Sequence, residues 1–75
     1  MRRAVVFEAR REGYGIDQFA HQAMTVGELK ELLEDIEDDA LFVLSHDSGY
    51  TYGSIDARDA TVYQEQEDGE WTQEW

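Results

Sequence analysis

The chain has 75 residues, no cysteine and a formal net charge of -12 at pH 7. This predicts one compact domain over residues 1–75 and excludes disulfides and thiolate metal sites. Residues 28–75 carry fifteen acidic and two basic side chains, whereas residues 1–27 carry three acidic and four basic ones. The negative electrostatic field of these side chains attracts basic protein surfaces and repels nucleic acid and anionic lipid. We therefore expect neither direct nucleic-acid binding nor membrane binding.

The first expected element is a strand over Ala4–Ala9, where β-branched and aromatic residues dominate and arginines lie at both ends. Gly13-Tyr14-Gly15 breaks this pattern. The following stretch, Ile16–Gln22, is compatible with a short strand that pairs back on the first or with an irregular loop. We favour the short strand.

A helix is expected from about Val26 to about Glu37. Thr25 and Glu28 have the spacing of a capping box, in which each residue satisfies a backbone N–H of the other. Met24 and Leu29 have the positions of the accompanying hydrophobic staple. Apolar residues follow at helical spacings of three and four: Val26, Leu29, Leu33, Ile36 and Ala40.

The second half of the chain alternates between apolar runs and turn residues. The continuous run Leu41–Leu44 predicts a central strand. Turn chemistry at His46–Gly49 separates it from an alternating strand over Tyr50–Ile55. A second turn at Asp56–Asp59 precedes a strand over Ala60–Glu65.

The chain closes with a hairpin. Asp68-Gly69 is a strong turn signal, and Glu70–Trp75 follows as a last strand with both tryptophans on one face. Short hairpins demand antiparallel pairing. The sequence therefore predicts an α+β fold, with an antiparallel sheet of four to five strands and one amphipathic helix packed on one face.

Acidic residues gather on the helix face opposite the apolar stripe and near the last hairpin. Spacings such as Glu31 to Asp35 place like charges one helical turn apart, which is unfavourable. Acids at the C-terminal end of the helix also oppose its dipole. This conflict is compatible with a merely solvated face, but it favours a surface for a cationic partner. The candidate partner-binding residues are Glu28, Glu31, Glu34, Asp35, Asp38, Asp39, Glu65, Glu67, Asp68 and Glu70.

The aromatic residues offer a second candidate contact surface. They exceed what one small core requires, and tyrosine and tryptophan are enriched in binding hot spots. Core and edge packing on the sheet is the simpler interpretation. The residues are Tyr14, Tyr50, Tyr52, Tyr63, Trp71 and Trp75.

No pattern predicts catalysis. His46-Asp47 lacks the further ligands of a metal site, and a turn with a capping aspartate explains it better. Asp47, Asp56 and Asp59 lie near turns, but the sequence lacks the loop of an EF-hand. Neither a phosphate-binding glycine loop nor a G-x-S-x-G frame occurs. We expect no enzyme, no cofactor and no metal ion.

Residues 24–55 resemble small proteins of phages and prophages. The similarity lies in Met24–Leu29 with its "TVGEL" helix start, Leu32-Leu33, the run Leu41–Leu44, and Gly49–Ile55 with its Gly-Tyr turn. The chain departs from that pattern at Asp38-Asp39, where a proline is often placed. In size and acidity it is also similar to nucleic-acid mimics that inhibit host defence nucleases, including anti-CRISPR and anti-restriction proteins.

These resemblances imply a small non-enzymatic inhibitor. Its acidic face would occupy a basic nucleic-acid groove of a CRISPR–Cas or restriction complex, in the cytoplasm of the host cell. The first alternative is an interaction or assembly module, such as a homodimer, that uses an aromatic sheet face. The second, a metal-dependent enzyme, has the least support.

Overall fold

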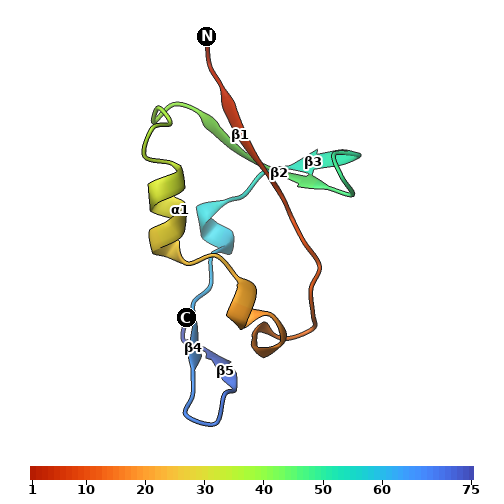
Figure 1. Cartoon of the computed structure of the whole chain (residues 1–75), viewed down its shortest axis with the longest axis vertical. Helices are drawn as coiled ribbons and strands as arrows, with labels where there is room; N and C mark the ends of the chain where they lie inside the picture. Colours follow the sequence, from red (N-terminus) through yellow and green to blue (C-terminus); the bar gives the residue numbers. More distant parts are fainter. The chain divides into compact units, whose positions relative to one another are not determined.

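The protein is described by a computed structural model that covers all 75 residues. Contacts divide it into two units, one of residues 1–10 and 24–55 and the other of residues 11–23 and 56–75. The elements are shown in Figure 1. They are strands β1 (Ala4–Glu8), β2 (Leu41–His46), β3 (Thr51–Gly53), β4 (Tyr63–Glu65) and β5 (Trp71–Gln73), helix α1 (Val26–Leu32), and 3-10 turns η1 (Ile16–Gln18), η2 (Ala20–Gln22) and η3 (Ala57–Asp59).

The architecture is α+β, but the strands form two small sheets instead of one. The first unit holds a three-stranded sheet in the order β1-β2-β3, and the second holds the pair β4-β5. β1 runs parallel to β2, with Ala4 opposite Leu41 and Glu8 opposite Ser45. The predicted single antiparallel sheet is therefore not formed. Parallel strands need a long crossover, and the chain between β1 and β2 supplies one that contains α1.

Helix α1 begins as the sequence predicts and ends earlier. The Thr25 side chain accepts the N–H of Glu28 at 3.1 Å, and the Glu28 carboxylate accepts the N–H of Thr25 at 3.0 Å. This confirms the capping box. The helix ends at Leu32, with Leu33 as its C-cap, so the predicted extension to Glu37 is wrong. Four acids follow the C-cap before residue 39, where the helix dipole disfavours negative charge.

An ion pair holds the segment after the helix. Arg3 donates to both carboxylate oxygens of Glu37, at 2.7 and 2.5 Å. This contact lowers the pKa of Glu37 to about 2, chiefly through the hydrogen bonds from Arg3. The segment between Leu33 and Leu41 turns through short-range bonds, such as that from Ile36 N–H to Leu33 C=O, and a chain anchored in this way does not continue the helix.

The apolar face of the first sheet lies against the chain around the helix C-terminus. Val5 and Phe42 are paired across β1 and β2, and they line one cavity together with Leu33 and Ile36. The rings of Phe7 and Phe42 lie 5.3 Å apart between centroids. No apolar side chain is fully buried, so this contact layer is thin.

The turn after β2 is confirmed and is tied to β1. Asp47, Ser48 and Gly49 all have positive φ, at 53°, 58° and 89°. The Glu8 carboxylate accepts the Ser45 hydroxyl at 2.7 Å and the Ser48 N–H at 3.2 Å. These bonds lower the pKa of Glu8, that from Ser45 contributing most. One carboxylate therefore links the end of β1 to a turn in a left-handed conformation that only glycine adopts readily.

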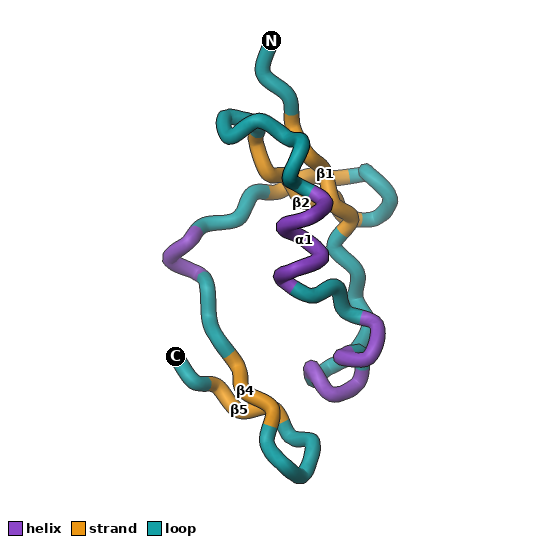
Figure 2. The backbone as a smooth tube through the Cα atoms, turned by 60° about the vertical axis from the view of Figure 1, so that its left-hand side comes forward, coloured by secondary structure: helices purple, strands orange, loops and turns teal.

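The second unit consists of short turns and one hairpin, and most of it is drawn as loop in Figure 2. The strand favoured over residues 16–22 is wrong, because η1 and η2 occupy this stretch. The side chain of Gln18 accepts the N–H of Tyr14 at 2.6 Å, which closes a local turn in place of a strand ladder. The predicted Asp68-Gly69 turn is confirmed: β4 and β5 pair antiparallel around it, and Gly69 has φ of 90°.

Candidate partner-binding site

The ten candidate acidic residues are all exposed, and they fall in both units. In the first unit two lie on α1 and four lie in the turns that follow it. In the second unit four lie on the β4–β5 hairpin or directly before β5. In chain order they are Glu28, Glu31, Glu34, Asp35, Asp38 and Asp39 in the first unit, and Glu65, Glu67, Asp68 and Glu70 in the second.

The predicted helical row of acids is not formed. Only Glu28 and Glu31 lie on α1, because the helix ends at Leu32. Glu34, Asp35 and Asp38 therefore do not stand one turn apart along a helix face. The apolar residues keep their helical spacing beyond Leu32. However, negative side chains near the C-terminus of a helix oppose its dipole and weaken its last turn.

Eight of these ten carboxylates have no partner within the protein. The chain contains two ion pairs, Arg3–Glu37 and Arg58–Asp56, and neither includes a candidate residue. Two candidates make local hydrogen bonds to backbone N–H groups, Glu28 in the capping box and Asp68 to Glu70 at 3.0 Å. The bond from Thr25 lowers the pKa of Glu28. The other eight carboxylates accept no hydrogen bond from the protein.

The hairpin concentrates acids within a few residues. Glu65 ends β4 and faces Trp71 across the ladder, and the turn places three further acids before β5. Gln66 donates its N–H to the carbonyl of Glu70 at 2.7 Å, which closes the turn. The backbone therefore displays four carboxylates around one tight loop.

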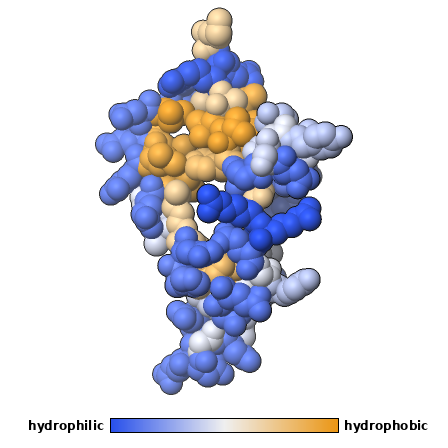
Figure 3. All heavy atoms as spheres, turned by 45° about the vertical axis from the view of Figure 1, so that its right-hand side comes forward, coloured by the Kyte–Doolittle hydropathy of each residue, from blue (hydrophilic) through white to orange (hydrophobic).

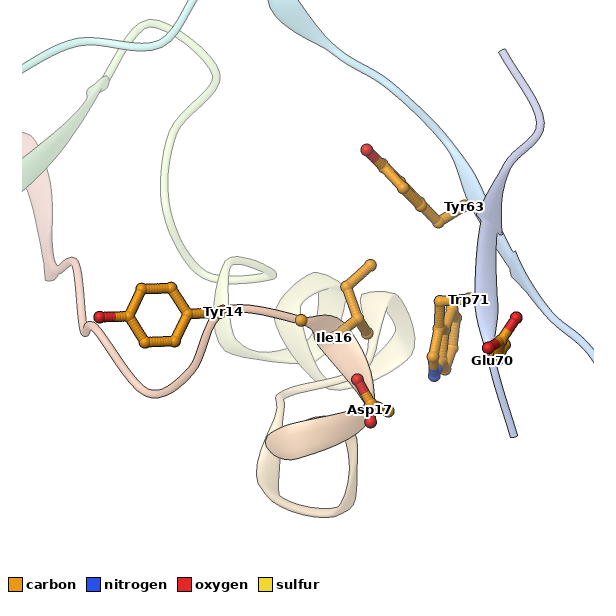
Figure 4. A pocket seen from close by; sticks show the side chains of 7 residues that line it. Tyr14, Ile16, Asp17, Tyr63, Glu70 and Trp71 are labelled. Atoms are coloured by element: carbon orange, nitrogen blue, oxygen red, sulfur yellow. The ribbon is translucent and has the colours of Figure 1, made fainter. Parts of the chain in front are cut away.

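A cavity of about 610 Å³ lies within the second unit. Figure 4 shows Ile16 and Asp17 on one side, from η1, and Tyr63, Glu70 and Trp71 on the other, from the hairpin. A face of the Trp71 ring is turned toward Ile16 and Asp17, while the ring of Tyr14 points away. The lining side chains are Tyr14, Ile16, Asp17, Tyr63, Glu70 and Trp71.

The cavity combines aromatic surface with negative charge. No lysine, arginine or histidine lines it. The indole N–H of Trp71 is buried and has no hydrogen-bond partner, which is rare in proteins because an unpaired buried donor costs free energy.

The sequence predicts only part of this cavity. Glu70 is one of the candidate acids, and Tyr14, Tyr63 and Trp71 are among the aromatic residues that exceed the needs of a small core. Ile16 and Asp17 are not predicted, because the sequence favours a strand over their segment. Gly13 and Gly15 beside them were the available signal for a turn.

Apolar surface is also exposed on the first unit. Val6 is 49%, Leu41 48% and Tyr52 65% exposed. The space-filling view shows apolar side chains gathered where the chain forms the three-stranded sheet (Figure 3). Such a surface can be contacted by a partner.

Three further comparisons concern metal ions, membranes and known proteins. No three histidine, cysteine, aspartate or glutamate side chains are grouped so that they could hold a metal ion. None of the helices has the length and apolar character needed to cross a bilayer. Comparison with protein-family models, with characterised proteins and with solved structures finds no match to this chain.

Proposed function

We propose that the protein is a non-enzymatic inhibitor that binds a basic, nucleic-acid-handling surface of a host defence complex, of the CRISPR–Cas or restriction nuclease kind. The observation that carries the proposal is the set of eight exposed carboxylates without a protein partner. The mechanism is competition, because carboxylates pair with the same arginine and lysine side chains that hold phosphates. The resemblance to phage proteins supports this setting, in the cytoplasm of a host cell.

The unpaired acids are costly for the free protein. A net charge of -12 on 75 residues repels itself, and acids placed after a helix C-terminus oppose the dipole. Neither arrangement improves the local structure. A cationic partner removes both costs at once, which is why the acids favour binding over simple solvation.

The test measures competition. The protein is titrated against a candidate complex, such as a purified CRISPR effector, in the presence of labelled DNA or RNA. We expect the nucleic acid to be displaced and the apparent affinity to fall steeply as sodium chloride is raised. Inhibition that persists unchanged in high salt would contradict the mechanism.

Charge variants identify the surface. The variant Glu31→Gln/Asp35→Asn/Asp38→Asn removes three acids of the first unit, and the variant Glu65→Gln/Glu67→Gln/Asp68→Asn removes three acids of the hairpin. The matched control, Asp47→Asn/Asp59→Asn/Glu74→Gln, removes equal charge elsewhere. We expect a candidate triple to lose inhibition and the control to retain it. If all three variants inhibit like the parent, the proposal is wrong.

A second candidate function is self-assembly, and the edge of β1 favours it. β1 pairs with β2 alone. Leu41 donates its N–H to the Arg3 carbonyl and Ala9 donates to Ser45, so the odd-numbered residues of β1 face β2. The backbone groups of Ala4, Val6 and Glu8 therefore point to the free edge. An apolar free edge can pair with a second copy.

The charges on this strand suit an antiparallel pair of copies. With Val5 opposite Val5 across a two-fold axis, Arg2 of each copy lies opposite Glu8 of the other. Residues 1–11 carry four arginines and one acid, so repulsion between copies is smallest here. Val6→Pro removes an edge N–H without touching the β2 ladder. We expect it to abolish dimers in equilibrium sedimentation, and a parent monomeric at all concentrations would exclude this candidate.

A further inference from the structure

The first unit contains a cavity of its own, of about 210 Å³. It lies between β1, β2 and the chain that follows helix α1, and we call it the groove. All residues that line the groove belong to the first unit, and most of them are apolar. The apolar walls are Val5, Leu33, Ile36, Ala40, Leu41 and Phe42.

The size of the groove suits one apolar side chain. An apolar cavity of about 150 Å³ can hold a benzene ring, whereas pockets for whole small molecules usually begin at about 300 Å³. None of the apolar walls is fully buried, and Leu41 is 48% exposed, so the groove can be entered from solvent. Walls that face open space lack the contacts of a closely packed interior, and an apolar group placed here supplies them.

The two sides of the groove are tied together. Arg3, directly before β1, donates to the carboxylate of Glu37 in the lining, at 2.7 Å. Leu41 donates its backbone N–H to the Arg3 carbonyl at 2.9 Å, and Ala40 donates to the Glu37 carbonyl at 3.1 Å. Because these bonds hold the groove in the free protein, little ordering free energy is lost when a ligand enters it.

The surroundings of the groove are negatively charged. Residues 33–42 contain five acids and no basic residue. Arg3 pairs with Glu37, and Asp38, which also lines the groove, has no partner in the protein. A segment that approaches the groove therefore meets a negative potential, which favours a basic segment and repels an acidic one. The other free acids near the groove are Glu34, Asp35 and Asp39.

We propose that the groove holds a leucine side chain of a basic segment of the partner, with arginine or lysine directly beside the leucine. The branched aliphatic walls contact the leucine, and the flanking cations stay at the hydrated rim, where the free acids attract them. This inference rests on the proposed function, because it gives the basic partner an apolar anchor next to its cations.

Other occupants fit less well. A nucleic acid or an acidic segment would be repelled by the acids of residues 33–42. A neutral apolar compound would fill the volume, but the acids would add nothing to its affinity. A second copy of this chain would bring its own net charge of -12 to the same surface.

The isoleucine side chains allow a test without a partner protein. The chain has three isoleucines, Ile16, Ile36 and Ile55. Only Ile36 lines the groove. The methyl signals of the other two are therefore internal controls for that of Ile36.

The experiment is a methyl NMR titration of the whole chain, ¹³C-labelled at its isoleucine methyl groups, with the capped peptide acetyl-Arg-Leu-Arg-amide. We expect the Ile36 signal to shift at millimolar peptide while the signals of Ile16 and Ile55 stay unchanged. Acetyl-Arg-Ala-Arg-amide keeps the charge and should bind about tenfold or more weakly. Acetyl-Gln-Leu-Gln-amide keeps the leucine and should bind about threefold or more weakly.

Three outcomes with the parent protein overturn the inference. They are an unmoved Ile36 signal, equal affinity for the leucine peptide and either control peptide, and an Ile36 signal that shifts with protein concentration before peptide is added. The last outcome would show that a second copy occupies the groove.

Variants of the chain make the assignment specific. Ala40→Leu fills the groove from its own wall, so it should abolish the Ile36 shift without lowering the melting temperature. Ala60→Leu, at an exposed position of the second unit, is the control and should bind like the parent. Asp38→Asn should weaken the arginine peptide about two- to fivefold, whereas Glu67→Gln should not. A folded Ala40→Leu variant that binds as well as the parent would also overturn the inference.

The two proposals fail in different ways. If the charge variants abolish inhibition of a basic complex but the leucine peptide leaves Ile36 unmoved, the inhibitor proposal stands and the groove proposal is wrong. If the peptides bind as described but no basic complex is inhibited, the groove binds a basic leucine segment and the inhibitor proposal is wrong.

Discussion

The two units of this chain divide its apolar residues and its charge unequally. The first unit contains the longest strands, the helix and the Phe7–Phe42 contact, and its nine acidic and four basic residues give a net charge of -5. The second contains short turns and one hairpin, and its nine acidic and two basic residues give -7. The unit with the least regular structure is thus the more acidic one. We therefore expect substitutions in the first unit to change stability more than substitutions in the second.

The largest expected effect comes from weakening the first unit. Phe42→Ala removes the ring that packs on Phe7 and should lower the free energy of unfolding by up to about 3 kcal/mol, less than for a fully buried ring. Tyr52→Ala, at a side chain 65% exposed, is the control and should change little.

This variant also tests whether the units unfold together. Both tryptophans lie in the second unit, so fluorescence reports that unit, whereas circular dichroism weights the helix and the longer strands. If Phe42→Ala shifts the dichroism transition and leaves the fluorescence transition in place, the units are energetically independent. Coincident shifts would support the prediction of a single cooperative domain, which stays a prediction here.

The helix cap should have the next largest effect. Thr25→Ala removes the acceptor for the Glu28 N–H and should destabilise the first unit by about 0.5–2 kcal/mol in urea unfolding. Thr61→Ala is the matched control, because that hydroxyl makes no hydrogen bond. A urea midpoint that stays the same in both variants would show that the capping box contributes nothing to stability.

Lowering the pH should remove the stabilising effect of the Arg3–Glu37 ion pair over a defined pH range. The pKa of Glu37 is lowered to about 2 in the folded chain, so its contribution is complete above the unfolded pKa of about 4.3 and is lost as pH falls toward 2. Glu37→Gln should be less stable than the parent at pH 6, and the difference in melting temperature should shrink through this window. A difference that stays constant down to pH 2 would rule out the ion pair as its cause.

Salt should have the smallest effect, and it tests the difference in net charge between the two units. Sodium chloride screens repulsion among exposed acids, with a Debye length of about 10 Å at 0.1 M. We expect the melting temperature to rise between low and moderate salt, and more for a transition followed by fluorescence, since the second unit is the more acidic. A fall or no change would mean that the free acids do not destabilise the fold.

Features set by neighbouring residues could be predicted from the sequence. The capping box joins Thr25 and Glu28, and the Asp68-Gly69 turn needs a glycine whose φ is 90°. The exposure of the ten acids followed from their charge, because water solvates an unpaired carboxylate better than a protein interior does. Hydrogen bonds between residues three or four positions apart are local, and so is the solvation of a side chain. Both can therefore be predicted from the composition and spacing of the sequence.

Contacts between residues far apart in the sequence could be known only from the folded structure. The parallel pairing of Ala4–Glu8 with Leu41–Ser45 and the bond from Arg3 to Glu37 join residues more than thirty positions apart. The cavity likewise needs the turn at Ile16–Gln18 beside a hairpin that begins at Tyr63. Contacts of this kind depend on which surfaces meet after the chain has closed, and no periodicity along the sequence records them.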